Sequence, residues 1–136
     1  MALASVGGGS QVGDGNVSEI RLYIQPAPQT ATSTATLTVA QAIGGILLGS
    51  PGSSAATYTL PTVALTEAAL VNAKNDSCFD LSVMNVDGSG SGIITLAVGT
   101  GWTAVGLMTI AATAGTAQLF RCRKTGTGAW SIYRIG

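Results

Sequence analysis

The chain has no histidine and is poor in charged and aromatic residues. Its 136 residues include 6 Lys+Arg and 6 Asp+Glu, which is 9% charged, where a soluble domain usually carries about 25%. The absence of histidine excludes Ser-His-Asp and Cys-His nucleophile pairs, imidazole metal ligands and a histidine pH switch. A net charge of zero removes the long-range attraction on which nucleic-acid binders depend. The composition therefore points to no catalytic class.

Long hydrophobic runs are also missing. The hydrophobic 46% is mostly Ala and Val dispersed among Thr, Ser and Gly, so no run approaches the roughly 20 residues that span a bilayer. The first residues, MALASV followed by GGGS, have neither the basic region nor the apolar stretch of a signal peptide. We expect a protein made in the cytoplasm, with neither a membrane nor a nucleic acid as its partner.

Cysteine is scarce, and no metal-ligand spacing is visible. Cys78 and Cys122 form no CxxC motif, and in a reducing compartment such cysteines are usually small buried hydrophobes. A disulfide between them is the alternative. Asp76, Asp80 and Asp87 do not have the spacing of an EF-hand loop, and the glycine clusters match neither GxxxxGK[ST] nor GxGxxG. We expect no metal, no cofactor and no enzymatic activity.

Short alternating runs separated by glycine turns dominate the chain from residue 18 onward. The first such run, in which Ile20, Leu22 and Ile24 alternate with polar residues or tyrosine, predicts a half-buried strand. Turn signals every 8 to 12 residues indicate a sandwich or barrel. The predicted fold class is all-β: a single-domain β-sandwich or jelly-roll-like barrel over residues 18–136, with one short helix. Residues 1–17, rich in Gly and Ser, predict a flexible N-terminal arm.

Threonine alternates along the segment QTATSTATLTVAQ. The hydroxyls that fall on one face belong to Thr30, Thr32, Thr34, Thr36 and Thr38. A flat threonine ladder can bind ice, but ice binding usually needs several stacked rows, and no repeat period is visible. We interpret the segment as one long strand with a polar face.

The single helix is predicted in PTVALTEAALVNAK. Thr62 is a suitable N-cap, Ala and Leu favour a helix, and the segment ends near Asn75. Because the helix is short, packing must hold it in place.

A surface with so little charge favours association, which suggests that copies or a partner cover it. The basic residues gather near the C-terminus, where TGTG predicts a closing hairpin with Arg123 opposite Trp130 and Phe120 opposite Tyr133. One face of this hairpin is then expected to carry Arg121, Arg123, Trp130 and Arg134, and the other Phe120, Cys122 and Tyr133. The second set is typical of a core. The first combines arginine with tryptophan, as interfaces do, and we predict that it makes assembly contacts. The alternative is a solvated face with one cation–π pair.

From about Thr57 to Gly136 the chain resembles the head decoration (cement) proteins of tailed bacteriophages. The resemblance rests on TYTLPTVALTEAALVNA, FDLSVMNVDGSGSGIITLAVGTGWT and the terminal AWSIYRIG. It implies a mainly β protomer that forms a homotrimer and binds the major capsid protein on the outside of an icosahedral virion, where it stabilises capsomer junctions. Attachment would then be multivalent, so weak contacts gain avidity.

Two other functions are compatible with a β-rich chain. A trimeric phage fibre or spike module that binds a host glycan should show aromatic platforms, whereas aromatic residues make up only 5% here. A secreted ice or surface binder should carry a signal peptide, which the sequence does not show. The decoration protein is therefore the expected function.

Overall fold

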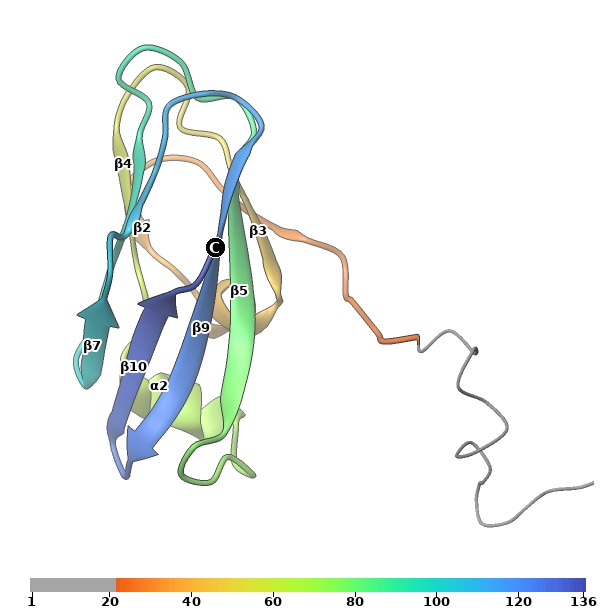
Figure 1. The fold of residues 1–136 in the computed structure, drawn as a ribbon, viewed down its shortest axis with the longest axis vertical. Coiled ribbons are helices and arrows are strands. Elements are labelled where there is room, and N and C mark those ends of the chain that lie inside the picture. The colour runs from red at the N-terminus through yellow and green to blue at the C-terminus, as the bar shows by residue number, and fades with distance from the viewer. Residues whose placement is uncertain (1–21) are drawn as a thin grey trace, which may run out of the picture.

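The computed structural model describes residues 22–136, which form a six-stranded sheet, a four-stranded sheet and two short helices (Figure 1). The predicted arm, residues 1–17, lies outside the described residues. The larger sheet contains β1 (Gln29–Ala31), β3 (Ile46–Gly49), β5 (Cys78–Asn85), β7 (Trp102–Val105), β9 (Thr116–Gly126) and β10 (Ala129–Arg134). The smaller sheet contains β2 (Ala35–Thr36), β4 (Ala56–Thr59), β6 (Ile94–Ala97) and β8 (Thr109–Ile110). The helices are α1 (Val39–Ile43) and α2 (Val63–Ala69). The mainly β prediction is confirmed.

The chain alternates between the two sheets as far as β8. The strand order is β1-β3-β5-β9-β10-β7 in the larger sheet and β2-β4-β6-β8 in the smaller one. Each of the first strands is followed by one in the opposite sheet, and the strands that return to the same sheet first run parallel: β1 with β3, β3 with β5, β2 with β4, and β4 with β6. The next return, from β6 to β8, is antiparallel. Only after β8 does the chain make a hairpin within one sheet, between β9 and β10.

One core lies between the sheets, because alternate residues of each strand point inward. The larger sheet contributes Leu47, Leu81, Val83, Phe120, Cys122, Trp130 and Ile132. The smaller sheet contributes Ala56, Tyr58, Ile94, Leu96 and Ile110. The two indoles find polar partners at the rim of this core: Trp102 Nε1 donates to the Pro61 carbonyl at 2.8 Å, and Trp130 Nε1 donates to Glu67 at 3.1 Å. The core therefore buries both tryptophans without an unpaired N–H.

The prediction of one long threonine strand is wrong. The chain forms β1, bends at residues 33–34, forms the two-residue β2 in the other sheet and then enters α1. Tyr58 fixes the bend from inside, because its hydroxyl donates to the Thr32 carbonyl at 2.8 Å. Thr34 Oγ1 accepts the backbone N–H of Thr57. The threonine hydroxyls therefore share no flat face, and the hydroxyl oxygens of Thr34 and Thr38 accept hydrogen bonds from backbone N–H groups instead.

The helix prediction is confirmed at its start but wrong at its end, because α2 ends at Ala69 and not near Asn75. Thr62 caps α2, and its Oγ1 accepts the N–H of Leu65 at 3.3 Å. The prediction of a single helix is wrong, since α1 is a second one. Thr38 and Gln41 form a reciprocal capping box there, with Thr38 N–H donating to the Gln41 side chain at 2.8 Å. The described residues contain no helix long and apolar enough to cross a bilayer.

The predicted half-buried strand around Leu22 is absent from the described residues. Residues 22–28 belong to no helix or strand, and the side chains of Leu22, Tyr23 and Ile24 are 88%, 82% and 97% exposed. Residues 20 and 21 lie outside the described range. For the described part of this run, residues 22–24, the strand prediction is therefore wrong.

Candidate assembly surface

The β9–β10 hairpin has a register one residue away from the predicted one. Trp130 lies opposite Lys124, Tyr133 opposite Arg121, and Arg134 opposite Phe120, with a bulge between Ala129 and Trp130. Because the side-chain period of a strand is two, a slip of one residue turns the side chains of one strand to the other face. The predicted face of Arg121, Arg123, Trp130 and Arg134 therefore does not exist as a unit.

Arg121 and Asp80 form a bidentate pair on the outer face of the larger sheet. They are direct cross-strand partners on β9 and β5. Arg121 Nε and Nη2 donate to the two Asp80 oxygens at 2.7 and 3.0 Å. The guanidinium lowers the pKa of the Asp80 carboxyl, and the carboxylate raises the pKa of Arg121. Both side chains remain about half exposed, so the pair adds geometric order more than stability.

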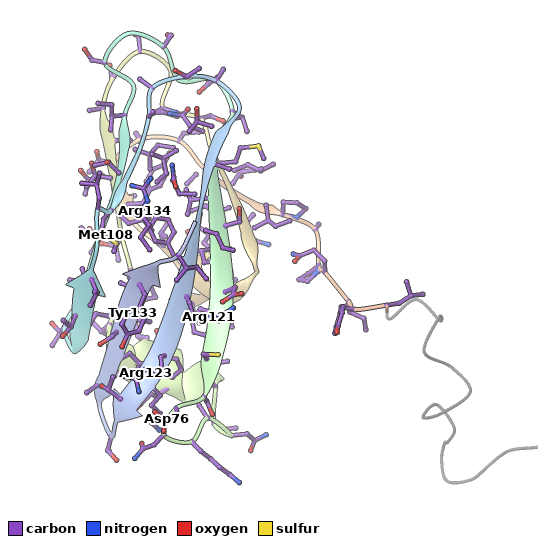
Figure 2. The ribbon with its side chains drawn as sticks, viewed as in Figure 1. Asp76, Met108, Arg121, Arg123, Tyr133 and Arg134 are labelled. Carbon is purple, nitrogen blue, oxygen red and sulfur yellow. The ribbon has the colours of Figure 1, made fainter. Side chains whose placement is uncertain are left out.

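Arg123 continues this outer face toward the turn before β5 (Figure 2). Its Nη1 donates to Asp76 at 2.6 Å, and its Nε and Nη2 donate to the Tyr133 hydroxyl at 3.2 and 3.0 Å. The hydrogen bond from Arg123 lowers the pKa of the Tyr133 hydroxyl. The prediction that Tyr133 belongs to the core is wrong, because the register places Tyr133 on the outer face, half-buried beside Arg123.

The other two predicted contact residues do not share this surface. Trp130 is 1% exposed and packs between Phe79 and Trp102, with ring centroids 5.7 Å apart in each pair. Arg134 reaches from β10 to the connection between β7 and β8, where its Nη1 donates to the carbonyls of Leu107 and Thr109 at 3.3 and 3.4 Å. Of the predicted set, only Arg121 and Arg123 lie together on the outer face.

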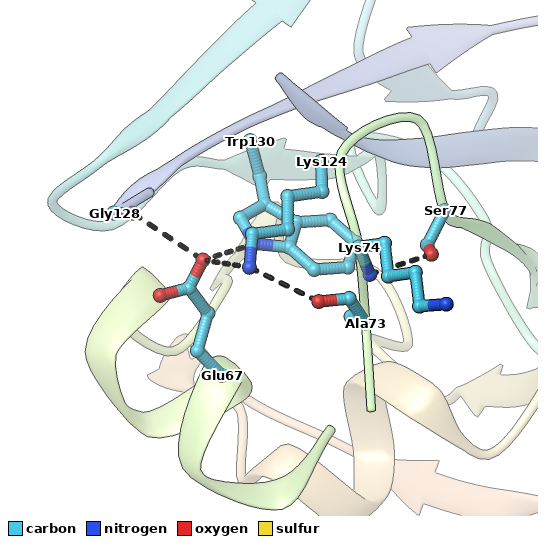
Figure 3. Close-up of polar contacts among 7 residues, drawn as sticks. All are labelled: Glu67, Ala73, Lys74, Ser77, Lys124, Gly128 and Trp130. Atoms are coloured by element: carbon cyan, nitrogen blue, oxygen red, sulfur yellow. Dashed lines mark hydrogen bonds and ion pairs between the residues drawn. The ribbon is translucent and has the colours of Figure 1, made fainter. Parts of the chain in front are cut away.

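A second polar cluster joins α2 to the hairpin (Figure 3). Glu67 Oε2 accepts from Trp130 Nε1 at 3.1 Å and from the Gly128 N–H at 3.3 Å, and it lies 3.4 Å from Lys124 Nζ. Lys124 also donates to the Ala73 carbonyl at 3.2 Å. The Trp130 hydrogen bond, assisted by Lys124, lowers the pKa of the Glu67 carboxyl. Three of the four C-terminal basic residues are thus paired with carboxylates, so they form no free cationic patch.

The two cysteines are free and point to opposite faces of the larger sheet. Cys78 lies opposite Arg123 on the outer face, while Cys122 lies opposite Phe79 on the inner face and is 1% exposed. Cys122 is buried as expected, but Cys78 is exposed. A disulfide would need both sulfur atoms on one side of the sheet.

A pocket of about 300 Å³ opens beside Cys78, at the end of α2. Its walls are mostly apolar and include Leu70, Val71, Phe79 and Trp130. The described residues hold no group of three or more carboxylate or thiol side chains placed for a metal ion. The distinctive features of the described residues are therefore this apolar pocket and the ion pairs of Arg121, Arg123 and Lys124.

Sequence reasoning missed Asp76, Asp80 and Tyr133 as the partners of the two arginines. The alternation in CFDLSV, with Phe79 and Leu81 on one face and Asp80 on the other, is a usable signal for Asp80. The pairing itself could not be predicted, because the partners lie 41 and 47 residues apart and meet only when β5 and β9 become neighbours.

Comparison of the chain with protein-family models, curated proteins and solved structures gives no match in any of the three.

Proposed function

We propose that this chain is a structural virion protein that binds the outside of an icosahedral phage capsid as a trimer and stabilises the junctions between capsomers. It acts by binding and catalyses no reaction. Its partners are two further copies of itself and the major capsid protein, and its place is the exterior of the virion. We also propose that the two sheets form a β-sandwich, because they share one hydrophobic core. The sandwich is not a jelly roll, because jelly-roll strands pair antiparallel, whereas most neighbouring strands here are parallel.

The observation that carries the proposal is the set of large apolar side chains that stand exposed on a chain with few charges. Among residues 22–136, the large hydrophobic side chains that stand exposed are Leu22, Tyr23, Ile24, Leu65, Val71, Val86, Ile93, Val105, Leu107, Leu119 and Ile135. Scattered singly, such residues are ordinary on a monomer. Here Val105 and Leu107 fall in one short stretch, and Leu119 accepts at its carbonyl the N–H groups of Ile135 and Gly136, which brings Leu119 and Ile135 together. Neighbouring exposed apolar side chains of this kind suit contacts between proteins.

The neutral outer face supports the same proposal. Arg121 and Arg123 are satisfied by Asp80 and Asp76, so this face attracts polyanions weakly. A planar guanidinium held by a carboxylate still presents donors and a flat face to a partner. We keep Arg121 and Arg123 as proposed assembly contacts.

The glycan-binding alternative finds less support. Stacking against sugars needs exposed aromatic rings, and both tryptophans are in the core. Among the described residues Tyr23 is the one aromatic side chain with most of its surface exposed.

The test combines mass measurement with head binding. Light scattering of the purified chain should give about three times the protomer mass of 13.5 kDa. The chain should co-sediment with empty heads assembled from the major capsid protein of the same genome, but not with heads of an unrelated phage, which serve as the control. A monomer that leaves both kinds of head undecorated would overturn the proposal. Specific retention on a glycan array without head binding would favour the fibre module.

A further inference from the structure

β7 is an unprotected edge of the larger sheet. It pairs with β10 on one side, and among the described residues no strand pairs with it on the other. Thr103, Ala104 and Val105 are all exposed, although alternate residues of a strand face opposite sides. Even the side chain directed toward the inner face, that of Ala104, therefore remains in contact with solvent.

The other edges are protected in ways that β7 is not. β2 and β8 are two residues long, and β1 is preceded by Pro26 and Pro28, which cannot donate to a ladder. β7 has four residues and contains no proline and no charge. An edge of this kind is a template for another strand unless something covers it.

Within the described part of the chain, residues 22–24 carry an alternating pattern but pair with no strand. Leu22, Tyr23 and Ile24 lie in no helix or strand and are more than four-fifths exposed, and the segment leads away from the two sheets (Figure 1). Its base is fixed, because Gln25 Nε2 donates to the Gly44 carbonyl at 2.7 Å. Three consecutive bulky apolar side chains in water are costly to leave uncovered.

The segment cannot cover the β7 edge of its own copy. β1 and β7 form opposite edges of the sheet, five strand-to-strand steps apart, which is about 24 Å at ~4.8 Å per step. From the fixed Gln25 the chain reaches Leu22 within about 14 Å even when fully extended. Figure 1 shows the segment leaving on the side of β3, with β7 on the far side of the body.

We propose that residues 22–24 of one copy add as a strand to the β7 edge of a second copy. Backbone hydrogen bonds supply the pairing, and alternation places Leu22 and Ile24 beside one face of β7 and Tyr23 beside the other. Because the donor and the acceptor lie on opposite edges, each copy gives to one neighbour and receives from another. Such a head-to-tail interface closes into a ring when the rotation between copies permits it. The inference rests on the self-association in the proposed function and names the surfaces that carry it.

Cross-linking between two differently labelled chains tests this pairing. In a Cys78→Ser background, a tagged Ile24→Cys chain is mixed with an untagged Ala104→Cys chain under mild oxidation. We expect a mixed disulfide dimer to form at least tenfold faster than with Val71→Cys in place of Ile24→Cys. Val71 is a matched control because it is also an apolar, 78% exposed side chain. Equal rates for the two mixtures would overturn the proposal.

A second pair of variants guards against a misleading cross-link. Leu22→Ser with Ile24→Ser on the donor, or Thr103→Lys on the acceptor, should each convert the oligomer to monomer while far-UV circular dichroism stays unchanged. An oligomer that survives both changes would refute the strand pairing. Head binding is scored separately: decoration without the cross-link overturns the pairing alone, and the cross-link without decoration overturns the capsid role alone.

Discussion

The carboxylate of Glu67 accepts the indole N–H of Trp130 at 3.1 Å, a contact across 63 residues of sequence that joins α2 to the closing hairpin. The same oxygen accepts the N–H of Gly128 and faces Lys124, so three donors converge on one atom. The short helix is thereby tied to the larger sheet by an ionised group. This arrangement makes the attachment of α2 sensitive to acid.

The first prediction concerns that acid sensitivity. The folded-state pKa of Glu67 is lowered from its unfolded value of about 4.3, so the unfolded chain binds the proton more readily. The stabilisation is fully present above pH ~4.3 and is lost as the pH falls through the lowered folded-state pKa. The urea midpoint of the wild type should therefore exceed that of Glu67→Gln at pH 7, and the difference should narrow by pH 3. Both midpoints can be followed by tryptophan fluorescence. A difference that stays constant over this range would contradict the assignment.

The second prediction concerns the thiols. Cys78 is exposed, whereas burial raises the pKa of the Cys122 thiol to about 12 and removes it from solvent. Native protein should react with a maleimide at one thiol per chain, and protein in guanidinium chloride at two. Mass spectrometry of the labelled Cys78→Ser variant supplies the control, since native protein should then remain unlabelled. Rapid native labelling of that variant would show that Cys122 is accessible.

The third prediction concerns the buried amide of Asn85. Its Nδ2 donates to the carbonyls of Gly92 and Ala111 at 2.8 and 3.0 Å, which links β5 to the β5–β6 connection and to the β8–β9 connection. Asn85→Asp replaces these donors with a buried carboxylate facing two carbonyl oxygens, and we expect it to cost about 3 kcal/mol in free energy of unfolding. Asn72→Asp makes the same chemical change at an exposed site and should stay within about 0.5 kcal/mol. Equal losses in urea melts would contradict this role.

The fourth prediction separates assembly from stability at the outer face. Arg121→Ala removes an exposed ion pair, so the melting temperature should change little. If the guanidinium contacts a partner, assembly measured by light scattering across a dilution series should weaken about tenfold, as for a modest interface hot spot. Lys74→Ala is the control, because Lys74 is an exposed cation that forms no ion pair with a carboxylate of the described residues. A lower melting temperature with unchanged assembly would make Arg121 a structural residue.

Local signals in the sequence determined the elements that depend on near neighbours. Thr62 caps α2 because an N-cap needs only the two or three residues that follow it. Leu81 and Val83 are buried on one face because the strand period acts within a single run. The lack of histidine had already removed a class of chemistry before any fold was known.

The register of the closing hairpin was decided by one residue. The bulge at Ala129–Trp130 shifts the pairing of β10 with β9 by one residue, so that Trp130 lies in the core and Tyr133 lies on the outer face. A turn sequence such as TGTG is compatible with more than one register, and packing of the indole against Phe79 and Trp102 selects between them. The predicted assembly face failed for this reason.

The sequence by itself determined that the chain is built of short strands with one well-capped helix, because alternation and capping act over a few residues. Tertiary structure alone decided that successive strands alternate between two sheets and that Arg121 meets Asp80. It also decided that the threonine-rich segment bends at residues 33–34, where the Tyr58 hydroxyl donates to the Thr32 carbonyl. These outcomes depend on which distant segments become neighbours. Burial of one shared core settles that choice, and no local pattern encodes it.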